Sequence, residues 1–241
     1  MNPPRLKTGI ILPTFADSAD EAIDVAHDAE DAGIDGVFCY DHIWPMGQPT
    51  RPALAPFPVL GALASSTSRL SIGTLVARVG LIPNDLLICE FETLKLLAPG
   101  RVIAGLGTGD RLSAAENVNY GITFGSVSDR LSSIAYCTQS LKELGIETWI
   151  GGGSRRTLDL AHELKAVVNL WGASPDQIRT QAKLGEVTWA GMTPEASEEA
   201  SSESRLGTLI NKISAAGASW IVLAWPTPLD ILVEVASKIA I

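Results

Sequence analysis

Short, nearly continuous apolar runs recur eight times along the chain. Such runs are typical of strands covered on both faces, as in a parallel sheet, whereas half-exposed strands alternate apolar and polar residues. Segments with helical spacing of apolar residues separate the runs, which predicts an α/β fold, a closed (β/α)₈ TIM barrel. The eight predicted strands are Gly9–Pro13, Gly36–Tyr40, Leu70–Val76, Val102–Leu106, Thr148–Ile150, Val167–Leu170, Val187–Ala190 and Trp220–Ala224.

Helix start and stop signals mark the segments between these runs. Ser18 and Glu21 have the spacing of a capping box, and Gly33 fits the end of the same helix. Asn84 is placed to cap the helix before the fourth strand, and Ser154 to cap the helix after the fifth. The segments therefore predict helices between successive strands.

The composition is that of one globular domain over residues 1–241. The chain is 46% hydrophobic and 19% charged, so enough apolar surface exists to offset the entropy of folding. A net charge of −9 argues against a nucleic-acid partner, because such binding requires basic side chains. No run approaches the roughly 18 apolar residues of a membrane span. Cys39, Cys89 and Cys137 fit no metal-ligand or redox pattern. We therefore expect a soluble, cytoplasmic protein with no metal site and no membrane or nucleic-acid partner.

Candidate chemistry is concentrated where the predicted strands end, because the carboxyl ends of barrel strands build the active site. After the second strand come Asp41, His42 and Trp44. A histidine can change protonation near neutral pH, a neighbouring carboxylate can orient it, and a tryptophan can form a flat wall for a ring system. The alternative is structural: Asp41 caps a turn, and His42 is a satisfied structural residue.

Glycines follow the fourth strand, which runs into Gly107, Thr108, Gly109 and Asp110. Glycines let a ligand approach the backbone, and exposed amides can bind an anion or a ring carbonyl. The same pattern also occurs in nucleotide-binding and methyl-transfer folds, so it leaves the cofactor open. The long connection from Gly107 to Ser126 is typical of a functional loop or of disorder.

The fifth strand runs into Gly151, Gly152 and Gly153, and a helix capped by Ser154 follows. Free amides and the helix dipole favour a phosphate here, and Arg155 with Arg156 adds positive charge in an otherwise acidic protein. We favour this phosphate site over the alternative of a tight turn with exposed arginines.

The order of these pieces resembles the bacterial luciferase-like, flavin- or deazaflavin-dependent oxidoreductase family. The resemblance covers about residues 8–170. It rests on Ala29–Val37 followed by Asp41–His42, on Gly73–Val76 with Pro83, Thr93–Leu94 and Pro99–Arg101, on Gly105–Gly109, and on Trp149–Gly152 with Leu158 and Ala161. Compared with the family, the connection between the fourth helix and Gly151 is short, because Leu141–Ile146 leads almost directly to Trp149.

The resemblance implies a barrel whose cofactor, FMN or the deazaflavin coenzyme F420, lies across the strand ends. It implies a cis peptide at Leu75–Val76, which with Thr74 would form part of the cofactor site, and a homodimer. It also implies that His42 and an acid near Asp110 lie by the reacting face. This chain has aspartate where the family frequently has glutamate, so the reach of this acid is shorter.

Our leading hypothesis is a luciferase-like oxidoreductase or monooxygenase that transfers a hydride or electrons between its cofactor and a small organic substrate. His42 and Asp110 would be catalytic. F420 is slightly favoured over FMN, because the arginines beside the glycine turn could compensate for its oligoglutamate tail. One alternative is a non-catalytic barrel that serves as a binding or dimer partner. Another is a methyl donor-dependent transferase, which normally has its glycine turn after the first strand rather than the fourth.

Overall fold

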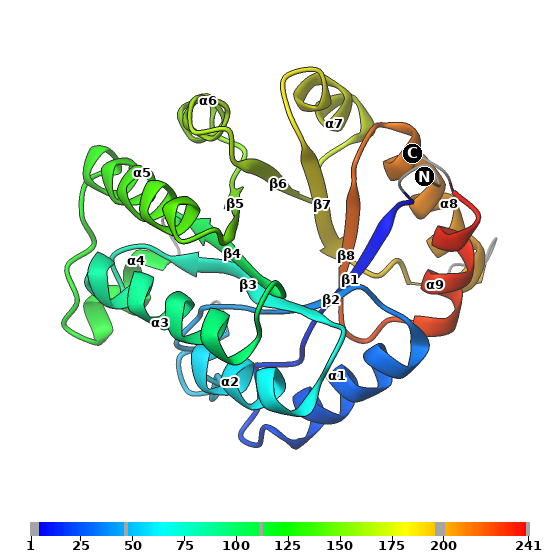
Figure 1. Cartoon of the computed structure of the whole chain (residues 1–241), viewed down its shortest axis with the longest axis horizontal. Coiled ribbons are helices and arrows are strands. Elements are labelled where there is room, and N and C mark those ends of the chain that lie inside the picture. Colours follow the sequence, from blue (N-terminus) through cyan, green and yellow to red (C-terminus); the bar gives the residue numbers. More distant parts are fainter. Residues whose placement is uncertain (1–4, 46–47, 111–112, 196–200, 240–241) are drawn as a thin grey trace.

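The computed structural model describes residues 5–45, 48–110, 113–195 and 201–239. Within these ranges eight parallel strands close into a barrel in the order of the sequence, and β8 pairs with β1 (Figure 1). The strands are β1 (Lys7–Ile11), β2 (Gly36–Cys39), β3 (Ser71–Arg78), β4 (Val102–Gly107), β5 (Glu147–Gly151), β6 (Val167–Trp171), β7 (Val187–Met192) and β8 (Trp220–Ala224). The predicted TIM barrel is confirmed, with each strand within three residues of its predicted ends.

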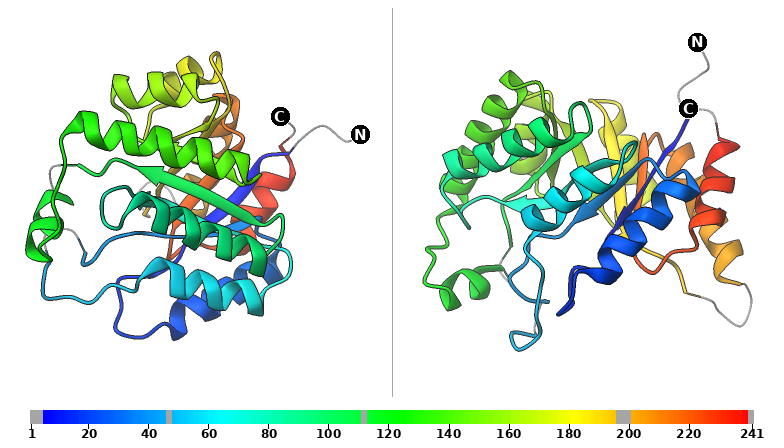
Figure 2. Two further views of the ribbon diagram at one scale, coloured as in Figure 1. Left: turned by 60° about the vertical axis from the view of Figure 1, so that its left-hand side comes forward. Right: turned by 60° about the horizontal axis from the view of Figure 1, so that its bottom comes forward.

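Helices follow the strands and, apart from the short helix Ser113–Asn119, cover the outside of the barrel (Figure 2). They are α1 (Asp20–Ala32), α2 (Pro56–Ser66), α3 (Asn84–Leu97), α4 (Ser113–Asn119), α5 (Val127–Glu143), α6 (Arg155–Glu163), α7 (Pro175–Ala182), α8 (Ser202–Ala215) and α9 (Leu229–Ser237). A large apolar core lies between these helices and the outer faces of the strands. In the described part of the chain, no helix has both the length and the apolar composition that a membrane span requires.

Two of the predicted helix caps were wrong. Helix α1 begins one residue later than the capping box requires, because Ser18 exchanges hydrogen bonds with Asp20 at 2.8 and 3.2 Å. Pro83 precedes α3, and Asn84 lies inside the helix, where its amide donates to Ser133 of α5 at 3.2 Å. The caps at Gly33 and Ser154 are confirmed.

Three aromatic rings pack together inside the barrel. Phe38, Trp149 and Trp220 form a compact group with ring centroids 5.2 to 6.0 Å apart, and each is at most 2% exposed. Gly9 and Gly36 make room for them, since an added Cβ would lie 3.0 Å from the Phe38 ring and 3.2 Å from the Trp220 ring. The interior of the barrel is therefore packed with side chains around these three rings.

Strand β3 is irregular near its carboxyl end. The peptide between Leu75 and Val76 is cis, as the family resemblance predicted, and the register against β4 shifts between Thr74 and Ala77. The connection that carries α4 projects from the barrel beside the loop that follows β2, as both views of Figure 2 show. These two segments from distant parts of the chain therefore meet at the mouth of the barrel.

Candidate active site

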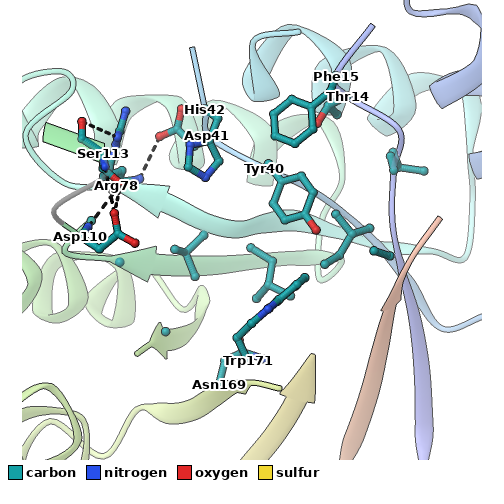
Figure 3. A pocket seen from close by; sticks show the side chains of 18 of the residues that line it. Thr14, Phe15, Tyr40, Asp41, His42, Arg78, Asp110, Ser113, Asn169 and Trp171 are labelled. Carbon is teal, nitrogen blue, oxygen red and sulfur yellow. Dashed lines mark hydrogen bonds between the residues drawn. The ribbon is translucent and has the colours of Figure 1, made fainter. Parts of the chain in front are cut away.

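A cavity of about 730 Å³ lies at the open end of the barrel (Figure 3). This volume is within the range of small-molecule and cofactor sites. Strand ends and the loops after them form its walls, so the topology of the barrel brings residues from opposite ends of the chain into one site. Its lining is Ile11–Ala16, Glu21, Tyr40–His42, Leu75, Val76, Arg78, Gly107–Asp110, Ser113, Gly151, Gly152, Asn169, Trp171, Met192, Ala224 and Trp225.

His42 is held by a buried carboxylate. Its Nδ1 lies 2.7 Å from Oε1 of Glu116, and Glu116 is only 1% exposed. The other carboxylate oxygen accepts the backbone N–H of Ile43 at 3.0 Å. Helix α4 carries Glu116, so this short helix positions the histidine that follows β2.

Arg78, at the end of β3, compensates the charge of this carboxylate. One terminal nitrogen donates to Glu116 Oε2 at 3.0 Å, and the other donates to the carbonyl of Ser113 at 3.1 Å. The arginine side chain is 4% exposed, so water does not screen this pair. A buried carboxylate without such a partner would carry a large desolvation penalty.

Asp41 completes the buried charge cluster. Its Oδ2 accepts the backbone N–H of Arg78 at 2.9 Å, which joins the end of β3 to the residue after β2. Burial raises the pKa of the Asp41 carboxyl, although this hydrogen bond and the charge of Arg78 act in the opposite direction. Asp41 thus orients the loop that carries His42.

This arrangement fixes the chemistry that His42 can perform. An ionised carboxylate only accepts hydrogen bonds, so Glu116 favours the neutral tautomer with its proton on Nδ1. The lone pair is then on Nε2, the ring nitrogen that Glu116 does not contact. His42 lines the cavity and can accept a proton at Nε2 or, once protonated, donate one there.

Aromatic side chains form one wall of the cavity. Tyr40 stacks on Phe15 with ring centroids 5.4 Å apart, and its ring lies 6.2 Å from that of His42 and 6.1 Å from that of Trp171 (Figure 3). Burial raises the pKa of Tyr40 to about 12, so the phenol stays protonated at neutral pH. The wall is therefore uncharged.

Another part of the cavity lining consists of the bulge in β3 and the glycines that face it. A Cβ at Gly107 would lie 2.3 Å from Cγ2 of Val76, and one at Gly151 would lie 2.6 Å from Cγ1 of the same side chain. The side chain of Val76 thus occupies the space that these two glycines leave open. Together with Leu75 it forms a short apolar surface under the cavity.

The sequence of the chain also matches a known protein family. The model of the luciferase-like monooxygenase family matches residues 2–132, more than half of the chain. The chain belongs to this family. The matched part includes the bulged strand, the glycines after β4, the histidine after β2 and the helix that holds it.

Curated relatives of this luciferase-like chain are named as F420-dependent enzymes. A curated protein of Nakamurella multipartita named F420-dependent glucose-6-phosphate dehydrogenase is 30% identical over 152 residues, which are 63% of this chain and 43% of the relative. A curated protein of Microbacterium testaceum with the same name is 28% identical over 190 residues, which are 73% of this chain and 54% of the relative. The matched part of the chain thus spans about half the length of these relatives.

A solved structure shows the same fold. The F420-dependent secondary alcohol dehydrogenase, in complex with an F420-acetone adduct, superposes with a TM-score of 0.79 at 15% identity, and 98% of each chain is covered. At this identity the likeness shows the luciferase-like barrel fold alone.

Most site residues predicted from the sequence line the cavity of this luciferase-like barrel. They are Asp41, His42, Leu75, Val76, Gly107, Thr108, Gly109, Asp110, Gly151 and Gly152. Asp110 also has a structural role, because its Oδ1 accepts the N–H and the hydroxyl of Ser113 at 2.9 and 3.1 Å. It therefore stabilises the start of α4, the helix that carries Glu116.

Five predicted residues lie outside this lining. Trp44 is buried against Tyr120, with ring centroids 5.6 Å apart, and supports the loop from behind. Thr74 is fully buried, and its hydroxyl donates to the Gly105 carbonyl at 2.7 Å. Gly153, Ser154 and Arg155 are exposed at the start of α6, beyond the rim that Gly151 and Gly152 form.

Among the site residues that sequence reasoning missed, five shape its chemistry. Glu116 lies in the long connection that was expected to be either functional or disordered, but no local pattern pairs it with His42. Arg78 ends a strand whose sequence gave no functional signal. Tyr40 and Trp171 do follow the rule that barrel sites form at strand ends, and applying that rule to every strand would have found them. Phe15 lies in the loop after β1.

Proposed function

We propose that the protein is a flavin- or deazaflavin-dependent oxidoreductase that acts on a small organic substrate. The observation that carries this proposal is the His42–Glu116 pair at the mouth of a cavity walled by the bulge of β3. Family membership supports it, as do the names of relatives that depend on F420. The chain matches only part of those relatives, so their substrate is not transferred to it.

The cavity fits a flat ring cofactor. The apolar surface of Leu75 and Val76 would support one face of the ring, and the backbone of Gly107, Thr108 and Gly109 would lie at its edge. Gly151 and Gly152 would lead its side chain out of the barrel, toward Gly153, Ser154 and Arg155 at the start of α6. When bound, such a cofactor supplies the hydride or electron transfer.

The protein's own groups would then position the substrate and move its proton. The Nε2 of His42 would accept the hydroxyl proton of an alcohol or donate a proton to a carbonyl oxygen. Glu116 would hold the opposite ring nitrogen and stabilise the imidazolium when it forms. Arg78 would hold the second carboxylate oxygen of Glu116 in place. Asp110 lines the same cavity and would be the second candidate for proton transfer.

We favour F420 over FMN as the cofactor. Arg155 and Arg156 are exposed at the start of α6, and Arg155 forms a long ion pair of 3.7 Å with Asp159. The oligoglutamate tail of F420 carries several negative charges, whereas FMN ends in one phosphate. In a protein of net charge −9, these arginines would offset the repulsion of the tail.

Titration of the purified protein with F420 and with FMN, side by side, tests this proposal. We expect F420 to bind more tightly. Replacement of Arg155 and Arg156 by Glu should weaken F420 binding more than FMN binding, and salt should reduce the difference. Tighter binding of FMN would contradict the preference for F420. Failure of both cofactors to bind would contradict the proposed function and favour a non-catalytic barrel.

We further propose that the protein forms a homodimer through α3. Three leucines of this helix are exposed to solvent: Leu86 at 47%, Leu96 at 77% and Leu97 at 50%. Large apolar side chains gathered on one surface are typical of protein contacts. The family resemblance supports a dimer but does not say which helix forms it.

A further inference from the structure

One wall of the cavity contains large apolar side chains that are exposed to solvent. Trp171, the last residue of β6, lines the cavity although it is 50% exposed, and Met192, the last residue of β7, lines it at 64% exposure. Large apolar side chains left open to water inside a concave site are typical of ligand-binding surfaces. Tyr40 and Phe15 extend this surface toward His42 (Figure 3).

The charges around the cavity point to the kind of ligand. Among the described residues that line it, Arg78 is the one Lys or Arg side chain. Its terminal nitrogens donate to Glu116 and to the carbonyl of Ser113, and its charge is paired with Glu116 at 3.0 Å, which leaves its buried Nε as the one guanidinium nitrogen without a partner in the described part of the chain. Glu21 adds an acid at the rim, where it accepts the indole N–H of Trp225 at 3.1 Å. An anionic substrate would enter without a counter-charge.

We propose that Phe15, Tyr40, Trp171 and Met192 form a substrate subsite for an uncharged alcohol or carbonyl compound with a flat or cyclic apolar body. This inference rests on the proposed function and narrows its substrate class. The apolar body lies against Tyr40 and Trp171, and the oxygen points to His42. A sugar phosphate, such as the names of the relatives imply for those proteins, does not match this subsite.

Two features support the orientation. The ring of Tyr40 lies between Phe15 and Trp171 and meets that of His42 nearly edge-on, at 63°, so a ligand against the wall reaches the imidazole. The wall stays neutral at physiological pH, because the phenol is protonated. Aromatic faces attract other aromatic or cyclic apolar groups through contact area and quadrupole geometry.

A matched pair of probes tests the subsite. Benzyl alcohol and benzoate share one ring and differ mainly in charge, and their binding to the full chain can be measured by calorimetry with and without bound F420. We expect benzyl alcohol to bind at least about tenfold more tightly than benzoate, since an unpaired buried carboxylate costs more than 1.4 kcal/mol. Equal affinities, or tighter binding of glucose 6-phosphate, would overturn the inference.

Variants locate the binding. Trp171→Ala should weaken the binding of benzyl alcohol about five- to tenfold, because the ring loses a stacking partner. Leu184→Ala, which truncates a 65% exposed side chain outside the cavity, should leave the affinity unchanged. Trp171→Arg should improve benzoate binding by adding the missing counter-charge. If Trp171→Ala and Leu184→Ala have the same effect, the subsite is not where we place it.

Competition separates this inference from the proposed function. Benzyl alcohol should bind the F420-loaded protein as well as the free protein. If F420 displaces it, the wall belongs to the cofactor and the inference is wrong. If no cofactor binds but the preference for benzyl alcohol and its dependence on Trp171 persist, the proposed function fails and the assignment of the wall stands.

Discussion

The Nδ1 of His42 lies 2.7 Å from Oε1 of Glu116, a carboxylate that is 1% exposed and is neutralised by Arg78 at 3.0 Å. The two residues are 74 positions apart in the sequence. They meet because the loop after β2 and the connection after β4 both lie at the open end of the barrel. This contact gives the histidine a defined tautomer and leaves Nε2 for chemistry in the cavity.

Replacement of Glu116 by Gln should affect both stability and turnover. The buried Arg78 would lose its anionic partner, and breaking a buried ion pair costs about 3 kcal/mol. Loss of the group that orients His42 should lower kcat by about 10- to 100-fold. Urea unfolding and cofactor turnover measure the two effects. Glu163→Gln, which alters an exposed acid on α6, is the control and should change neither. An unaltered kcat in Glu116→Gln would rule out its positioning role.

Asp41→Asn should change the pH dependence of stability. Burial raises the pKa of this carboxyl, so its stabilising contribution is present at low pH and is lost as pH rises through the raised pKa. Asparagine still accepts the N–H of Arg78 but does not ionise. The free energy of unfolding of the variant relative to wild type should therefore increase as the pH rises from about 4, the ordinary pKa of an aspartate, through the raised pKa of Asp41. A difference that stays constant or falls over this range would contradict the raised pKa.

The barrel could be predicted because its strands are buried on both faces and therefore appear as short apolar runs. The caps at Ser18 and Asn84 failed because each side chain found a nearer or tertiary partner, Asp20 and Ser133 respectively. Local sequence does not distinguish these partners from a helix end. That residues 1–241 form a single domain stays a prediction.

Site residues could be predicted only where they directly follow a strand in the sequence. Asp41 and His42 follow a strand directly, so the barrel rule finds them. Glu116 and Arg78 act through contacts across the fold, and nothing near either residue in the sequence indicates the partner. The glycines after β4 and β5 were expected to admit a ligand, and the structure adds another reason for two of them, the side chain of Val76.

The close approach of Val76 to Gly107 leads to a further prediction. Gly107→Ala would place a Cβ 2.3 Å from Val76 Cγ2 and should destabilise the protein by about 1–3 kcal/mol, as overpacking does. Val76→Ala in the same chain should recover most of this loss, which a double-mutant cycle of unfolding free energies measures. Gly153→Ala, with no atom within 4 Å of the added Cβ, is the matched control. Additive effects of the two substitutions would disprove the contact.

Leu96→Glu should dissociate the proposed dimer. Leu96 is the most exposed of the three α3 leucines, and a charge at its position would oppose burial in an apolar interface. Sedimentation at micromolar concentration should give a dimer for wild type and a monomer for the variant. Leu184→Glu, an equal change at another exposed leucine, should remain dimeric. A monomeric wild-type protein would contradict the proposal.

The central claim is that His42 moves a proton in a cavity that also holds a redox cofactor. Its most direct test measures the F420 affinity and the rate of F420 reduction by a neutral cyclic alcohol in wild type and in His42→Ala. We predict that the affinity changes less than about threefold, while the rate falls by at least about 100-fold, the usual contribution of a positioned acid or base. Equal rates in the two proteins, with F420 bound to both, would contradict the claim.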